Sequence, residues 1–383
     1  MVSVSADFQL DAKSASIARL ETASASPSDF NGAAHGLRGL ASVMVLVAHI
    51  IGGTARHIFP DNLAYVEAVK RPWFFGTFGV ELFFAISGFV ILPSVLRYSY
   101  SEFAIRRFMR IYPLFFVLSV IFCLLNFHTN NYPKMNNVES IVSGLLFINL
   151  FIGTEQLTPN AWSLSFEVIF YILTCVFVEL SIKRRAGVWA VLAIMASIIF
   201  TIMFPITIYF IIGLVARVIS KYKYPHGLVR NCAEIIALIS MIFLASRGHY
   251  EYVRNDLSNL SVILLIIATA IYFYFAILPG SLTGRALSNR PARYLGTISY
   301  SLYLVHPYIY FGVRGVFSHF HWFGADPWMS VVPFGLIVAA LSIFVSHFVN
   351  ITLEQGPYKW YFHQRVYQPK IAPRPCDDIT SFR

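Results

Sequence analysis

The sequence predicts an all-α membrane protein: a polytopic bundle of about ten transmembrane helices with one short interfacial or re-entrant helix. The composition leads to this fold class. Hydrophobic residues make up 57% of the 383 residues and charged residues 13%, whereas about 25% of a typical soluble domain is charged. Because apolar runs this long and numerous cannot be covered by a water-facing surface, a soluble globule is excluded.

The net charge of +10 would suggest a nucleic-acid partner in a soluble protein. In a membrane protein it has a simpler origin, because Lys and Arg collect in cytoplasmic loops. We therefore expect contact with membrane lipids and no nucleic-acid partner. The four cysteines have no paired spacing, so neither a disulfide framework nor a metal site is expected.

Apolar runs define the candidate spans. They lie at about 37–55, 74–96, 111–127, 141–152, 162–180, 187–203, 205–219, 233–245, 258–278, 296–316 and 330–350. The run at 141–152 has twelve residues, too few for a helix that needs about 20 to cross. If it does not cross and the N-terminus is cytoplasmic, the cytoplasmic segments hold 22 of the 29 Lys and Arg. The positive-inside rule therefore favours ten spans with both termini inside.

Three regions are expected along the chain. Residues 1–35 are rich in Ser and Ala and lack the apolar core of a signal peptide, so a disordered cytoplasmic tail is predicted. Residues 36–354 form the transmembrane domain, and the polar residues 355–383 form a cytoplasmic C-terminal tail.

Two ionisable residues lie in the first apolar run, in the stretch GLRGLASVMVLVAH. Arg38 and His49 are eleven residues apart, which in a helix is three turns plus about 20°, so both share one face. His49 lies about 16 Å further along the axis. With Arg38 at the cytoplasmic surface, this places His49 near the midplane of a core about 30 Å thick. Ionisable groups at this depth are functional candidates. A snorkelling Arg and a His that only bonds a neighbouring helix are the alternatives.

Further polar residues enter other spans. Arg107 and Arg110, in RRFMRIYP, share a helix face at the cytoplasmic start of the third span. They can bind phosphate oxygens or simply set the topology. Glu167 follows Trp162 in AWSLSFEVIFY and needs a partner or a proton in this setting, which a core Arg or His would also supply.

The candidates for a substrate pocket are Ser87, Trp162, Ser163, Tyr303 and His306. Tyr303 and His306 are at i and i+3 in ISYSLYLVHPYIY, on one face of the tenth span. Structural alternatives exist: close helix packing for Ser87 together with its neighbour Gly88, an aromatic belt for Trp162, and a satisfied core position for His306.

Six pieces of the sequence, taken in order, resemble the motifs of the acyltransferase-3 family of integral membrane acyltransferases. They are RGLASVMVLVAH, GVELFFAISGFVI, RRFMRIYP, WSLSFEVIFY, ISYSLYLVHP and LEQGP, and they span residues 36–357. Members typically O-acetylate sugars of surface polysaccharides, lipopolysaccharide or Nod factors. The N-terminal tail is longer than in many members, and these 383 residues are not expected to include the hydrolase-like domain fused to some of them, which favours a partner protein or a single direct transfer.

The resemblance implies acetyl-CoA, or another acyl-CoA, as the donor substrate, with no permanently bound cofactor. It implies a carbohydrate or lipid-linked carbohydrate as acceptor. The catalytic candidates are then His49 as general base, Glu167 as the carboxylate that orients it, and Arg38. Arg107 and Arg110 would hold the nucleotide phosphates, with Arg38 as a further contact.

Several alternatives stay open. Acyl transfer can be direct or can pass through a covalent acyl-histidine. A proton-coupled transporter would also need intramembrane His and Glu, and a non-catalytic scaffold is a third class. The expected location is the bacterial inner membrane, with multiple passes and both termini cytoplasmic. The sequence determines neither the acceptor nor the oligomeric state.

Overall fold

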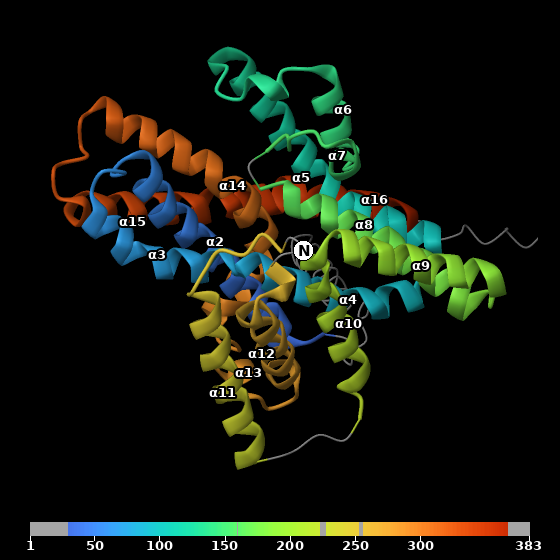
Figure 1. Ribbon diagram of the computed structural model, residues 1–383. Helices are drawn as coiled ribbons and strands as arrows, with labels where there is room; N and C mark the ends of the chain where they lie inside the picture. Colours follow the sequence, from blue (N-terminus) through green and yellow to red (C-terminus); the bar gives the residue numbers. More distant parts are fainter. Residues whose placement is uncertain (1–29, 159, 223–226, 253–255, 367–383) are drawn as a thin grey trace, which may run out of the picture.

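The computed structural model describes residues 30–158, 160–222, 227–252 and 256–366. Within these ranges every regular element is helical (Figure 1). The elements begin with α2 (Gly32–His57), α3 (Leu63–Thr77), α4 (Gly79–Arg97), α5 (Tyr100–Thr129), η1 (Pro133–Met135), α6 (Val138–Leu145), α7 (Asn149–Ile152), α8 (Trp162–Phe177) and η2 (Val178–Lys183). They continue with α9 (Gly187–Met203), η3 (Pro205–Thr207), α10 (Ile208–Ile219), α11 (Leu228–Ala245), η4 (Asp256–Ser258), α12 (Leu260–Ile277), α13 (Leu282–Ala286), α14 (Arg290–His319), α15 (Pro327–Val349), η5 (Asn350–Gln355) and α16 (Gly356–Val366).

Helices α2 and α14 form the centre of the fold, and side-chain caps set where each begins. The side chain of Asn31 accepts from the Ala34 N–H at 3.0 Å, and that of Asn289 accepts from the Ala292 N–H at 2.8 Å. Such caps satisfy N–H groups that have no partner within the helix. The two helices then pack closely, because a Cβ on Gly39 would lie only 2.6 Å from the backbone nitrogen of Gly296. Small residues at this crossing therefore bring the two backbones together.

The other helices pack around this pair (Figure 1). Helices α3 and α4 contact α2, α15 contacts α14, and α11 and α12 pack on each other at one side. Helix α4 also packs tightly on α10, where Gly88 faces the Phe210 carbonyl. The predicted close helix approach at this position is confirmed for Gly88. The neighbouring Ser87 instead turns its hydroxyl to Glu167.

Six helices among the described residues are long and apolar enough to cross a membrane, or up to seven if a bent pair counts as one span. The predicted number of about ten is not confirmed. Part of the difference lies in α9 and the following η3–α10 segment, predicted as two spans, which bend by 117° at a short break. The run near 258–278 gives an apolar helix of fewer than 18 residues, Leu260–Ala276. Helix α14 is long enough, but polar and charged residues lower its hydropathy.

The segment predicted not to cross folds back on itself. It forms α6 and α7 in place of one helix. Beside it, Lys134 Nζ and Glu155 Oε1 are 3.9 Å apart, and Ser143 Oγ lies 2.5 Å from Thr154 Oγ1. The two ends of the segment therefore lie together, in agreement with an interfacial or re-entrant arrangement.

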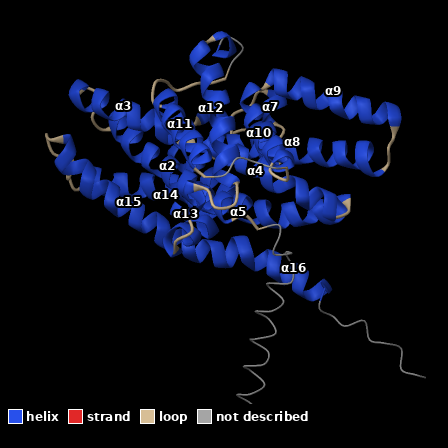
Figure 2. Cartoon of the chain, turned by 90° about the horizontal axis from the view of Figure 1, so that it is seen from below, coloured by secondary structure: helices blue, strands red, loops and turns tan. Residues whose placement is uncertain are grey.

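The two predicted tails lie mostly outside the described residues. Helix α2 begins at Gly32, four residues before the predicted start of the transmembrane domain. After the π-helical turn η5, the chain continues as α16, which packs beside α5 (Figure 2). The first part of the predicted C-terminal tail is therefore helical.

Candidate functional site

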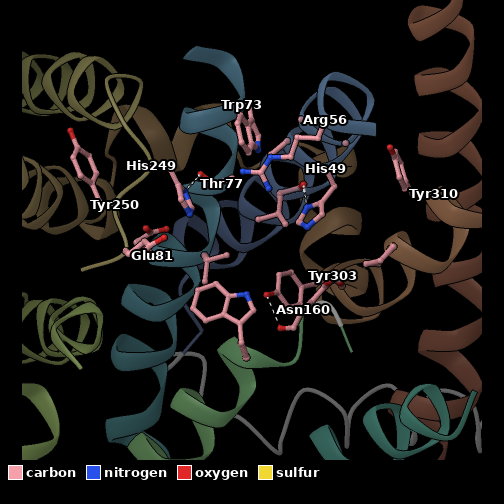
Figure 3. Close-up of a pocket in the computed structure, with 18 of the residues that line it drawn as sticks. His49, Arg56, Trp73, Thr77, Glu81, Asn160, His249, Tyr250, Tyr303 and Tyr310 are labelled. Atoms are coloured by element: carbon pink, nitrogen blue, oxygen red, sulfur yellow. Dashed lines mark hydrogen bonds between the residues drawn. The ribbon is translucent and has the colours of Figure 1, made fainter. Parts of the chain in front are cut away.

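His49 lines a cavity of about 590 Å³, which we call the outer cavity (Figure 3). Its walls come from the C-terminal halves of α2 and α14, from α3 and α4, from the start of α8, and from the loop that follows α11. The polar and aromatic residues that line it include His49, Arg56, His57, Trp73, Thr77, Glu81, Asn160, Trp162, His249, Glu251, Tyr303, Tyr310 and Phe311.

The imidazole of His49 is held in one tautomer. Its Nδ1 lies 2.8 Å from the backbone carbonyl of Val45, one turn earlier in α2. Because a carbonyl only accepts, Nδ1 carries the hydrogen and Nε2 has a free lone pair. This orientation suits a general base, since the group that takes a proton is the unprotonated Nε2.

A second histidine contacts His49 from α14. The ring centroids of His49 and His306 are 4.8 Å apart, with the planes at 70°. His306 is fully buried, and its Nδ1 lies 2.9 Å from the Leu302 carbonyl. Its Nε2 has no hydrogen-bond partner among the described residues. His306 therefore lies behind His49 rather than in the cavity wall, and it is not a satisfied core histidine.

Of the predicted pocket residues, Tyr303 and Trp162 line the outer cavity, whereas Ser163 does not line it. The Tyr303 hydroxyl lies 2.8 Å from Ser163 Oγ and donates to the Asn160 carbonyl at 3.1 Å. The Asn160 amide in turn donates to the Tyr303 carbonyl. These bonds fasten α14 to the start of α8.

Glu167 does not orient His49, which corrects the sequence-based assignment. Its Oε1 accepts from Ser87 Oγ at 2.7 Å and from the Tyr171 hydroxyl. The reason is helical phase: five residues after Trp162, Glu167 is turned by about 140° from the side chain that faces the cavity. The Val45 carbonyl occupies the place beside His49 that the carboxylate was expected to take.

A second, basic cavity of about 470 Å³ lies at the other end of α2 and α14, and we call it the inner cavity. The residues that line it include His35, Ser94, Arg106, Arg107, Arg110, Thr297, Glu354, Tyr358 and Lys359. The structure thus brings Arg107 and Arg110, which share one face of α5, into one cavity.

The three arginines that line this cavity differ in their hydrogen-bond partners. Arg106 is fully engaged, because it bonds to Glu102 Oε1 and to the Tyr358 hydroxyl, each at 2.7 Å. Arg107 donates to Ser94 Oγ at 2.9 Å. Arg110 forms no hydrogen bond or ion pair with the part of the chain that the structure describes. Arg110 is therefore the cation most available to a ligand.

Arg38 does not line the inner cavity, so its expected contact with a ligand there is not supported. It lies within electrostatic range of Arg110, Glu167 and Glu354. Glu167 also interacts electrostatically with Arg107. The carboxylate of Glu167 thus offsets part of the positive charge between the two cavities.

Sequence reasoning missed Glu354 as a site residue, although it is the acidic residue of the LEQGP piece. It lies in η5, is 7% exposed, and accepts from Ser301 Oγ and from the Asn350 amide, each at 2.7 Å. It lines the inner cavity and ties α14 to the end of α15. Arg56, Trp73 and Glu81 of the outer cavity were also missed, because residues near helix ends have unremarkable sequence patterns.

No group of three or more His, Cys, Asp or Glu able to hold a metal occurs among the described residues. The described part of the chain is a helical membrane protein with one cavity lined by His49 and another lined by Arg107 and Arg110, at opposite ends of α2 and α14. The family model of the acyltransferase domain, acyltransferase-3, matches residues 31–347, and the chain belongs to this family. The resemblance in the six sequence pieces is confirmed.

Two curated proteins are similar to this chain. The chain is 25% identical over 283 residues to the putative peptidoglycan O-acetyltransferase YrhL of Bacillus subtilis, covering 60% of this chain and 44% of the relative. It is 23% identical over 322 residues to the peptidoglycan O-acetyltransferase OatA of Listeria monocytogenes, covering 71% and 48%. The chain thus spans about half the length of these relatives. No solved structure matches it.

Proposed function

We propose that this protein transfers an acetyl group from acetyl-CoA to a hydroxyl of a cell-surface or exported glycan. One observation carries the proposal: α2 and α14 each run from the inner, basic cavity to the outer, histidine-containing cavity. His35 and Thr297 line the first cavity, and His49 and Tyr303 line the second. A cytoplasmic donor and an external acceptor can therefore approach the same helices from opposite ends.

The proposed orientation has the inner cavity in the cytoplasm of a bacterial cell and both termini inside. It follows from the distribution of Lys and Arg. The folded-back α6–α7 segment supports it, because a crossing there would reverse every later helix. Each cavity then faces the compartment in which its substrate is found.

The donor nucleotide binds in the inner cavity. Arg110 and Arg107 contact its phosphates through charge-assisted hydrogen bonds, for which guanidinium is well suited. From His35 to His49, α2 rises about 21 Å. The thin pantetheine arm follows this path and carries the thioester towards His49.

The acceptor hydroxyl binds in the outer cavity beside His49. Nε2 removes its proton as the oxygen attacks the thioester carbonyl, and the Val45 carbonyl stabilises the hydrogen on Nδ1. When the carbon–sulfur bond breaks, the imidazolium returns the proton to the departing sulfur, which leaves as the CoA thiol. A covalent acyl-histidine at Nε2, later attacked by the sugar, is the second route.

The two cavities share no lining residue. Along α4, Ser87 lies between Glu81 of the outer cavity and Ser94 of the inner cavity, and with Tyr171 it bonds to Glu167. For transfer, these side chains move so that the arm can pass. Arg38, on the same face of α2 as His49, then balances the charge of Glu167 during that movement.

The relatives support a glycan acceptor, since both carry names that specify peptidoglycan. The test uses full-length protein in nanodiscs, acetyl-CoA labelled in the acetyl group, and peptidoglycan oligosaccharides. We expect an alkali-labile acetyl ester on the sugar by mass spectrometry, together with one CoA thiol released per ester. Folded protein that forms no ester on peptidoglycan or other surface glycans, but moves solute in a proton-dependent manner in liposomes, would show a transporter instead.

A further inference from the structure

Arg56 lies at the mouth of the outer cavity, in the last turn of α2. Its Cζ is 4.3 Å from the ring centroid of Trp73. Trp73 itself is seated against Gly52, where any side chain would collide with the indole. Figure 3 shows Arg56 between Trp73 and His49. The indole thus holds one face of the guanidinium, and the N–H edge remains for a ligand.

Arg56 has no acidic partner in the described part of the chain. No ion pair or hydrogen bond joins it to a carboxylate, although two carboxylates line the same cavity. Glu81 is 9% exposed, and its Oε2 has no hydrogen-bond partner among the described residues. The Glu251 carboxylate interacts electrostatically with His249.

A second guanidinium adds to the positive charge at this mouth. Arg314 lies over the rings of Phe311 and Tyr310, at 5.0 and 5.7 Å, and both rings line the cavity. Arg314 and Arg56 both act electrostatically on His57. His249, in the loop after α11, adds no charge at neutral pH, because burial lowers its pKa. Because both cations lie within electrostatic range of His57, an anion bound at this end of the cavity would be attracted by both.

The position of Arg56 relative to His49 sets where such an anion would lie. The two are seven residues apart in α2, which is about 20° short of two full turns, so they share one face. The rise between them is about 10 Å. An anion on Arg56 would thus lie on the same sugar as the reacting hydroxyl or on the next unit.

We propose that the outer cavity selects acceptors that carry an anionic group, a carboxylate or a phosphate, and that Arg56 binds this group with Arg314 as support. This inference rests on the proposed function, because it names the class of acceptor. Trp73, Trp162 and Tyr303 supply the aromatic surfaces around the sugar, and Arg56 supplies the discrimination.

The test compares matched acceptors: an oligosaccharide with a free carboxylate, the same oligosaccharide as its methyl ester, and a polyprenyl pyrophosphoryl sugar. The wild-type protein should favour an anionic acceptor over its neutral form by at least about tenfold in kcat/KM, the size expected for one charge-assisted contact. Arg56→Gln should lose this preference, so that its kcat/KM for the anionic acceptor falls to that for the neutral ester. Arg247→Gln is the control, because Arg247 also stacks on a ring, Phe243 at 4.8 Å, but lines neither cavity.

The two anionic acceptors show where the anionic group comes from. A preference for the free carboxylate over its ester would indicate an acidic sugar, and a preference for the pyrophosphoryl sugar would indicate the lipid link. If wild-type protein treats both anionic acceptors and the ester alike, or if Arg56→Gln lowers all three equally, the proposal is wrong. Thermal stabilisation by each anionic acceptor in the absence of acetyl-CoA separates this inference from the proposed function. Stabilisation of wild type but not of Arg56→Gln by either anionic acceptor would support the anion site even if no acetyl transfer occurred, and its absence with both acceptors in wild type would overturn it.

Discussion

Replacing His49 by Ala should abolish acetyl transfer while leaving the helical bundle folded. The structure predicts this separation, because His49 lines a cavity and, among the described residues, its side chain hydrogen-bonds only to the Val45 carbonyl. That carbonyl keeps its partner within α2, so no buried acceptor is left without a hydrogen bond. Ala also favours a helix.

The expected magnitudes differ clearly. Loss of one intramolecular hydrogen bond changes the free energy of unfolding by about 0.5–1.5 kcal/mol. Loss of a general base lowers the rate by about 10²- to 10⁴-fold. At 1.36 kcal/mol for each factor of ten, this is about 2.7–5.4 kcal/mol in the activation barrier. The loss of activity should therefore far exceed any loss of stability.

The assay measures release of CoA thiol and formation of the sugar ester by protein in nanodiscs, beside a thermal unfolding curve. His319→Ala is the matched control, because His319 is an exposed histidine at the end of α14 that lines neither cavity. Turnover by His49→Ala within a few fold of wild type would refute the general-base assignment. A large drop in melting temperature with full activity per folded molecule would refute the structural argument as well.

Three further predictions concern the donor site, the Glu167 carboxylate and the topology. Arg110→Ala should weaken acetyl-CoA binding by about 10- to 100-fold, and the effect should shrink at high salt; equal weakening for a pantetheine analogue without phosphates would show that Arg110 does not bind phosphate. Glu167→Gln should slow transfer by altering the charge near Arg38 but leave the pH dependence of kcat/KM in place, whereas a clear pH shift would restore its assignment as partner of His49. Cysteines placed at Asn136 and Glu155, in a protein without native cysteines, should both react with an impermeant thiol reagent added to intact cells; labelling of only the first would show that the α6–α7 segment crosses.

The sequence was sufficient for features that lie within one helix. The shared face of Arg38 and His49, and that of Arg107 and Arg110, follow from 3.6 residues per turn. The short run at 141–152 showed by its length that it is no ordinary span. The number of spans could not be predicted as well from the sequence. Apolar runs indicate where helices lie but not how sharply consecutive helices bend, and α9 and the η3–α10 segment bend sharply.

Only the tertiary structure decided which residues meet across helices. His306 lies against His49, and Glu167 bonds Ser87, although the paired residues are far apart in the chain. Arg56 became a candidate only once Trp73 and the rings of α14 closed a cavity around it. The physical reason is that helical periodicity is a local property of the backbone, fixed by dihedral angles and hydrogen bonds between near neighbours. The rotation of one helix against another depends on close packing at positions such as Gly39 and Gly296, and no stretch of sequence carries that information by itself.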